Sequence, residues 1–127
     1  MAGVVVDTSV WIDFFAGART DALEEALEIG AAVIPPIVVA ELVSGATTPE
    51  QRERIGELLQ DAPVHATPLD HWIRVGDLRR MLARKGVTVT VPDAHVAQCA
   101  LDRDAVLLAR DAVFTLIARH TPLRLRE

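Results

Sequence analysis

The sequence holds one cysteine, one lysine and no long apolar run, and each shortage excludes a class of protein. The single cysteine, Cys99, rules out an internal disulfide and any zinc site built from several thiolates. It lies in an apolar helical pattern, so we expect it to be buried and inert. The longest uncharged apolar stretch, residues 29–40, is too short to span a bilayer. Residues 1–4 lack the basic and apolar regions of a secretory signal, which favours a soluble, cytoplasmic protein.

The charge balance limits which partners the chain can have. Twelve of its thirteen basic residues are arginine, Lys85 is the exception, and the net charge is −5. An acidic chain does not suit a protein that coats nucleic acid non-specifically, because such a protein would be basic overall. The charge does not exclude an enzyme that cuts nucleic acid, since a bound cation changes the local field.

Short apolar runs alternate along the chain with segments of helical spacing. The 127 residues fit a single domain, 1–127, with an ordinary apolar content of 50%. The pattern predicts strands at 4–6, 32–34, 64–67, 106–108 and 123–125. It predicts helices at 8–15, 21–29, 37–44, 49–59, 69–85, 92–101 and 112–118. Strands that alternate with helices indicate an α/β fold with a central parallel sheet, here of four or five strands.

Four carboxylates stand where such a fold would bring them together. Asp7 follows the apolar run 4–6, and Asp111 closely follows the run 106–109. Glu41 is the one charge within residues 31–43, and Asp93 follows a proline at a helix start. Ligands of parallel α/β sheets gather outside the carboxyl ends of the strands. A converging set of hard oxygen ligands favours Mg²⁺ or Mn²⁺ and suggests hydrolysis of phosphodiesters.

Each acid also has a purely structural explanation. Asp7 and Asp111 could be helix N-caps, and Thr90-x-x-Asp93 fits a capping box. Glu41 could occupy an exposed position on a half-buried helix. The joint placement at one predicted edge is more specific than any single member. Carboxylates that do meet there require a cation, a proton or intervening water, because like charges about 4.5 Å apart repel by roughly 4 kcal/mol at an effective dielectric near 20.

The remaining polar residues give weaker indications. The four histidines show no spaced ligand pair, so we expect structural or surface roles for all of them: His65, His71, His95 and His120. A basic patch at the end of the longest helix could bind a substrate or complement the helix dipole, and the dipole is favoured for the last two of its members: Arg79, Arg80, Arg84 and Lys85. Arg110 abuts Asp111, and its role stays open between substrate binding and surface charge.

Four short motifs, in order, resemble those of PIN-domain nucleases. They are Val4-Val5-Val6-Asp7-Thr8-Ser9, Ala40-Glu41-Leu42-Val43-Ser44-Gly45, Pro92-Asp93-Ala94-His95-Val96-Ala97 and Leu107-Leu108-Ala109-Arg110-Asp111-Ala112-Val113. The resemblance covers essentially the whole chain, and its compact length is most similar to VapC toxins of toxin–antitoxin pairs. Many relatives carry threonine where Ala109 stands and a second acid where Val113 stands.

The resemblance implies a PIN-like three-layer α/β/α domain that acts as a Mg²⁺- or Mn²⁺-dependent endoribonuclease. Asp7 and Asp93 would be the main metal ligands, with Glu41 completing the site and Asp111 supporting it. Ser9 resembles the family's hydroxyl after the first acid, and Thr8 is the alternative.

The resemblance also implies partners: RNA as substrate, a second copy in a homodimer, and a VapB-like antitoxin. The aromatic side chains of the first helix, Trp11, Phe14 and Phe15, could receive the antitoxin. A catalytically weak PIN scaffold that only binds antitoxin or RNA is the alternative. A receiver domain would need an acid where Val6 stands, so that alternative lacks support. A haloacid-dehalogenase-type phosphatase would need an aspartate where Ser9 stands, so it lacks support as well.

Overall fold

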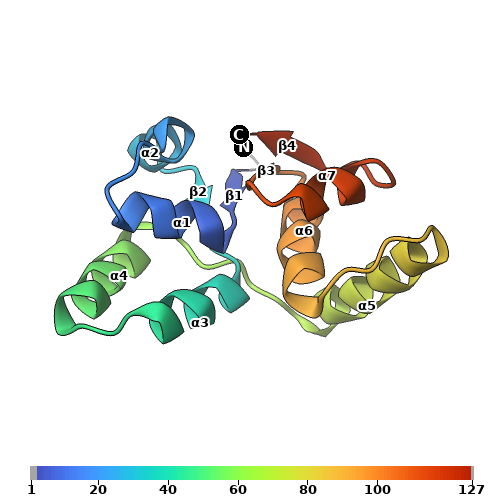
Figure 1. The fold of residues 1–127 in the computed structure, drawn as a ribbon, viewed down its shortest axis with the longest axis horizontal. Coiled ribbons are helices and arrows are strands. Elements are labelled where there is room, and N and C mark those ends of the chain that lie inside the picture. Colours follow the sequence, from blue (N-terminus) through green and yellow to red (C-terminus); the bar gives the residue numbers. More distant parts are fainter. Residues whose placement is uncertain (1–2, 127) are drawn as a thin grey trace.

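The computed structural model describes residues 3–126, and within them a four-stranded parallel sheet forms the centre of the fold (Figure 1). Its strands lie in the order β2-β1-β3-β4. Their bounds are β1 (Val4–Val6), β2 (Ala32–Val33), β3 (Val106–Leu108) and β4 (Arg124–Arg126). Every pairing is parallel, with Val6 opposite Leu108 at the carboxyl end of β1. The expected α/β class is therefore confirmed.

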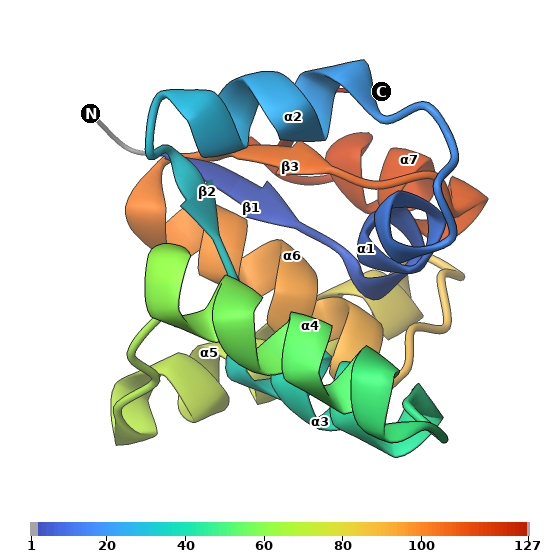
Figure 2. The ribbon, with the colours of Figure 1, turned by 90° about the vertical axis from the view of Figure 1, so that its left-hand side faces the viewer.

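Helices cover both faces of this sheet. Figure 2 shows α2 on one side and α6, with α3, α4 and α5 beyond it, on the other. The helices are α1 (Thr8–Phe15), α2 (Asp21–Glu28), α3 (Pro36–Gly45), α4 (Pro49–Asp61), α5 (Leu69–Arg84), α6 (Val91–Arg103) and α7 (Ala112–Ala118). Val5 and Val6 are fully buried as a result. Strands covered on both faces read as continuous apolar runs, which is why β1 and β3 were recognisable in the sequence.

The helix boundaries follow from capping chemistry. Thr48 caps α4 through a capping box with Gln51, and Pro49 takes the first helical position. Thr90 caps α6 by accepting the N–H of Asp93, as the sequence pattern indicated. Gly86 ends α5 with a φ of 81°, a conformation that residues with a side chain rarely adopt. Local sequence therefore sets where these helices begin and end.

One predicted element is wrong. Residues 64–67 form a single bridge, Val64 with Ile34, instead of a fifth strand. Two hydrogen bonds hold it, from the Ile34 N–H to the Pro63 carbonyl and from the His65 N–H to the Ile34 carbonyl. Pairing stops there because β2 is only two residues long and runs into Pro35, which has no N–H to donate. Prolines at 63 and 68 also bracket the segment.

The core is built from large side chains beneath and beside the strands. Trp11, Leu23, Leu107, Phe114 and Ile117 are among those fully buried. Cys99 is buried too, and burial raises the pKa of its thiol to about 12, so it is inert as expected. Over residues 3–126, no helix has the length and apolar character needed to cross a membrane.

Candidate active site

Asp7 is the most buried of the four acids, with 8% of its surface exposed. It directly follows β1, and its own N–H bonds the Leu108 carbonyl of β3. The Ser9 hydroxyl donates to its Oδ2 at 3.1 Å. It occupies the N-cap position of α1, but in the described chain its side chain makes no capping hydrogen bond there. Helix capping therefore does not explain this buried carboxylate, and the expected contact with Ser9 is present.

The electrostatic surroundings of Asp7 point to the other acids. Burial raises the pKa of Asp7, and the charges of Asp93 and Glu41 raise it further. Hydrogen bonds from Ser9 and from the Thr8 backbone lower it, but the pKa stays above its ordinary value. A nearby cation would stabilise such a carboxylate, because a positive charge favours its ionised form.

Glu41 lies on α3 and is exposed, which is the position that its purely structural explanation requires. Its side chain is nevertheless held in place. The Thr8 hydroxyl donates to its Oε1 at 2.9 Å, which joins the start of α1 to the middle of α3. Thr8 and Ser9 thus have separate roles, since Thr8 orients Glu41 and Ser9 orients Asp7.

Asp93 lies in the first turn of α6 and is half-buried. Burial raises the pKa of its carboxyl, and the charges of Asp111 and Glu41 raise it as well. Its backbone N–H donates to the Thr90 side chain, so the cap of α6 comes from Thr90, and a hydrogen bond from Thr90 to the Asp93 carboxyl partly offsets the rise in its pKa. The charges of Asp111 and Glu41 act on Asp93, and the charge of Asp93 acts on Asp7, so Asp93 is electrostatically linked to the other three acids.

Asp111 is exposed and caps α7 by accepting the Val113 N–H at 3.0 Å. Its structural explanation is therefore satisfied by one carboxylate oxygen. The charge of Asp111 acts on Asp93, so it lies at the same edge as the other acids. Val113, where many relatives carry an acid, packs against the hydrophobic core.

The four acids act on one another through their charges, but they do not form a compact group. In residues 3–126, only one group of three potential ligands has its atoms within 4.8 Å of one another, and it contains none of the four. Wider spacing suits Mg²⁺, which usually keeps several waters and binds one or two carboxylates directly. The all-oxygen donor set and the raised pKa of two of its members fit such an ion.

That one close group consists of His65, His71 and Cys99, and it adjoins His95. Both ring nitrogens of His71 are already used, Nδ1 against Asp102 and Nε2 against His95, each at 2.7 Å. A metal would have to displace one of these partners, so the group is a polar cluster of the interior. Burial lowers the pKa of His95 to about 4, helped by His71 and His65, so its ring is neutral at pH 7.

The expected structural or surface roles of the histidines are therefore consistent with the structure, since His120 is exposed and the other three are buried. Sequence reasoning missed that these three meet, because they come from separate elements. The four-residue spacing of His95 and Cys99 was the one available indication.

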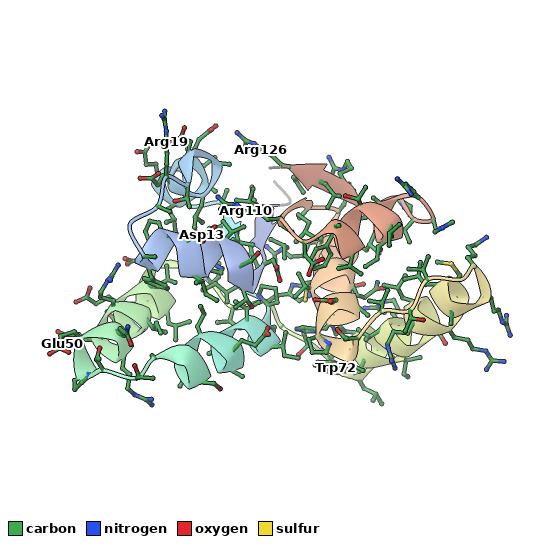
Figure 3. All side chains as sticks on the ribbon, viewed as in Figure 1. Asp13, Arg19, Glu50, Trp72, Arg110 and Arg126 are labelled. Carbon is green, nitrogen blue, oxygen red and sulfur yellow. The ribbon has the colours of Figure 1, made fainter. Side chains whose placement is uncertain are left out.

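Arg110 forms an ion pair with Asp13 of α1, which Figure 3 shows between α1 and the turn before α7. Both side chains are partly exposed. The pair holds a guanidinium one residue before Asp111, beside the acids. A nucleic-acid phosphate arriving at this edge would compete with Asp13 for it.

The aromatic residues of α1 divide between core and surface. Trp11 is fully buried, so it cannot receive a partner directly, whereas Phe14 and Phe15 are half-buried. An apolar groove of about 290 Å³ runs between α1, α3 and α4. Its lining includes Ile12, Phe15 and Leu42, with Glu41 among them.

Sequence comparison identifies the class of protein to which this fold and these acids belong. The model of the PIN domain matches residues 4–120, so the chain is a member of the PIN domain family. The VapC ribonuclease Mb1587 of Mycobacterium bovis and ribonuclease VapC11 of Mycobacterium tuberculosis are each 28% identical to it over 131 aligned positions. Each alignment covers 95% of this chain and 96% of the relative.

Solved structures share the fold. A DNA-bound VapBC from Salmonella typhimurium matches with a TM-score of 0.82 and 23% identity, over 99% of this chain and 98% of that one. VapBC-1 from nontypeable Haemophilus influenzae matches with a TM-score of 0.79 and 21% identity, over 98% and 96%. The three-layer PIN-like architecture expected from the motifs is thereby confirmed.

Proposed function

We propose that this chain is a VapC-like toxin, a metal-dependent endoribonuclease that a VapB-like antitoxin inhibits. The observation that carries the proposal is that the buried carboxyl of Asp7 feels the charge of Asp93. Residues 86 positions apart in the sequence lie at one sheet edge, and the pKa of each carboxyl is raised by burial and by neighbouring acids. Buried carboxylates that lower the stability of the metal-free protein and suit a hard cation are characteristic of metal-assisted hydrolysis.

In this proposal, Asp7 and Asp93 hold Mg²⁺ or Mn²⁺, directly or through water. When bound, the ion would lower the pKa of water and neutralise charge on the phosphoryl group. Ser9 keeps the Asp7 carboxylate in its orientation. Glu41, held by Thr8, completes the site or orients the attacking water. Asp111 supports the ion with the oxygen that does not cap α7.

Product analysis tests the chemistry. Attack by water should leave a 5′-phosphate and a 3′-hydroxyl, and cleavage should require added Mg²⁺ or Mn²⁺. Asp93→Asn should abolish cleavage without unfolding the protein, because Thr90 supplies the cap of α6. Cyclic phosphate ends would refute hydrolysis by water. Failure of the wild type to cleave RNA, together with retained antitoxin binding, would favour the weak PIN scaffold.

The antitoxin is proposed to occupy the groove of Ile12, Phe15 and Leu42, next to Glu41. Ile12 is 56% exposed there, and apolar residues exposed in a groove suit an apolar peptide segment. Ile12→Asp should weaken inhibition by the antitoxin while leaving RNA cleavage unchanged. Equal inhibition of the wild type and Ile12→Asp would place the antitoxin elsewhere. Sedimentation of the free toxin would test the proposed homodimer.

A further inference from the structure

A largely buried chain of hydrogen bonds connects α3, α6 and α5. The Ile37 N–H of α3 points to His95 Nε2 at 3.5 Å. His95 Nδ1 and His71 Nε2 lie 2.7 Å apart, and His71 Nδ1 lies 2.7 Å from Asp102 Oδ2. Both imidazoles are fully buried. Trp72 stacks on His95 with ring centroids 4.6 Å apart and planes within 4°, at the junction of α5 and α6 (Figure 3).

The two ends of this chain fix where its protons lie. A backbone N–H can only donate, so His95 Nε2 is an acceptor and its proton is on Nδ1. His95 then donates to His71 Nε2, which places the His71 proton on Nδ1, facing Asp102. Asp102 is an acceptor at that end, because Arg74 and Gln98 also donate to its carboxylate. The hydrogen bonds therefore run in one direction, from α3 to Asp102.

The chain starts and passes close to two of the acids. Ile37 is one helical turn before Glu41 on α3, and His95 is two residues after Asp93 on α6. The Ile37 N–H belongs to the first turn of α3, where backbone donors lack partners within the helix. Pro35 stands at the N-cap and has no side-chain acceptor to offer. His95 supplies that acceptor from the helix that carries Asp93.

We propose that His71 and His95 are positioning residues that hold the Glu41 helix against the Asp93 helix, with Asp102 fixing the direction of their hydrogen bonds. The proposal rests on the ribonuclease function proposed above. Both acids sit on separate helices, so the distance between them depends on how α3 docks against α6. A misplacement of about 1 Å at a catalytic site can reduce the rate roughly a hundredfold.

The first test needs no substitution. Nitrogen-15 NMR of the imidazoles at pH 7 should show the proton on Nδ1 and a bare Nε2 for both His71 and His95. Free histidine side chains prefer the opposite tautomer, so this pattern would be specific to the chain. A proton on Nε2 of either ring would overturn the proposed direction. This measurement does not depend on RNA cleavage, so it separates this proposal from the proposed function.

A matched pair of variants tests the positioning role. In His71→Gln the amide oxygen takes the place of Nε2 and can still accept from His95. In His71→Asn the amide group takes the place of Nδ1 and keeps only the contact with Asp102. Each variant loses one hydrogen bond of the chain. Only His71→Asn loses the bond to His95, the residue that contacts α3. We expect His71→Asn to lower kcat roughly tenfold more than His71→Gln, with KM little changed.

Two further readouts separate positioning from loss of stability. In a Glu41→Gln background, His71→Asn should cost little additional rate, because the chain acts through Glu41. Hydrogen exchange at the Ile37 amide should accelerate in His71→Asn and stay near wild type in His71→Gln. Equal rates for the two variants, or additive effects with Glu41→Gln, would show that the chain is only structural.

Discussion

Replacing Asp7 by asparagine should stabilise the metal-free protein. Asparagine keeps an acceptor for Ser9 and removes a charge that is 8% exposed. Weakening a charge-assisted hydrogen bond to a neutral one costs about 1 kcal/mol. Removing an ion from a buried site recovers several kcal/mol. We expect a net gain of about 2 kcal/mol at pH 8, which raises Tm by roughly 6–10 °C for a domain of this size.

The pH dependence gives the sign of the effect. The pKa of Asp7 is raised in the folded protein, chiefly by burial, above its ordinary value of 3.8. Its ionised form therefore costs stability, and that cost is present at high pH and disappears as the pH falls toward the ordinary value. The advantage of Asp7→Asn should be largest at pH 8 and should shrink at pH 4.

Thermal unfolding followed by circular dichroism, in the presence of EDTA, measures this difference. Asp77→Asn is the matched control, because it makes the same chemical change at an exposed position of α5. Adding millimolar Mg²⁺ should raise the Tm of the wild type and of the control but not that of Asp7→Asn. If Asp7→Asn melts at or below the wild-type temperature at pH 8, the buried charge is not a source of strain.

Substitutions at three further positions separate orientation, capping and packing. Thr8→Val removes the hydroxyl that holds Glu41 and should slow RNA cleavage roughly fivefold, the worth of one hydrogen bond of about 1 kcal/mol; an unchanged rate would show that Thr8 does not orient Glu41. Asp111→Ala should cost about 1 kcal/mol in urea unfolding through loss of the α7 cap, whereas Asp111→Asn should cost only a few tenths. Both Asp111 variants should weaken the Mg²⁺-induced rise in Tm, and a full rise in both would remove Asp111 from the site. Phe114→Ala, in the core, should lower the free energy of unfolding by about 3–5 kcal/mol in the same assay. A much smaller loss would mean that the surrounding core side chains collapse into the cavity.

The parts of the fold that sequence could predict are those set by local chemistry. β1 and β3 were recognisable because both of their faces are covered, and the start of α6 because Thr90 caps it. The strand at 64–67 was wrong because pairing depends on β2, which is interrupted by Pro35. Propensity within the segment carries no information about its partner.

Asp7, Asp93 and Asp111 were predictable for a similar reason, since their positions at strand ends and helix starts are properties of the sequence, whereas Glu41, in the middle of α3, was recognisable as the one charge in an apolar stretch. Their roles as ligands stay predictions. The connection from Ile37 through His95 and His71 to Asp102 was not predictable. It joins residues from three helices, and only the packing of α5 on α6 and of α6 on α3 brings them into register.

The two edges of the sheet differ from its centre in a way that limits how copies of this chain can associate. At one edge, β2 offers only two residues before Pro35. At the other, β4 presents Arg124 and Arg126, which bond to Asp104 and to Glu25 of α2. Short strands, prolines and charges are the features that discourage strand addition and amyloid-like stacking. We therefore expect a second copy to attach through helical surfaces, and a concentrated solution of this protein to stay free of sheet-mediated aggregation.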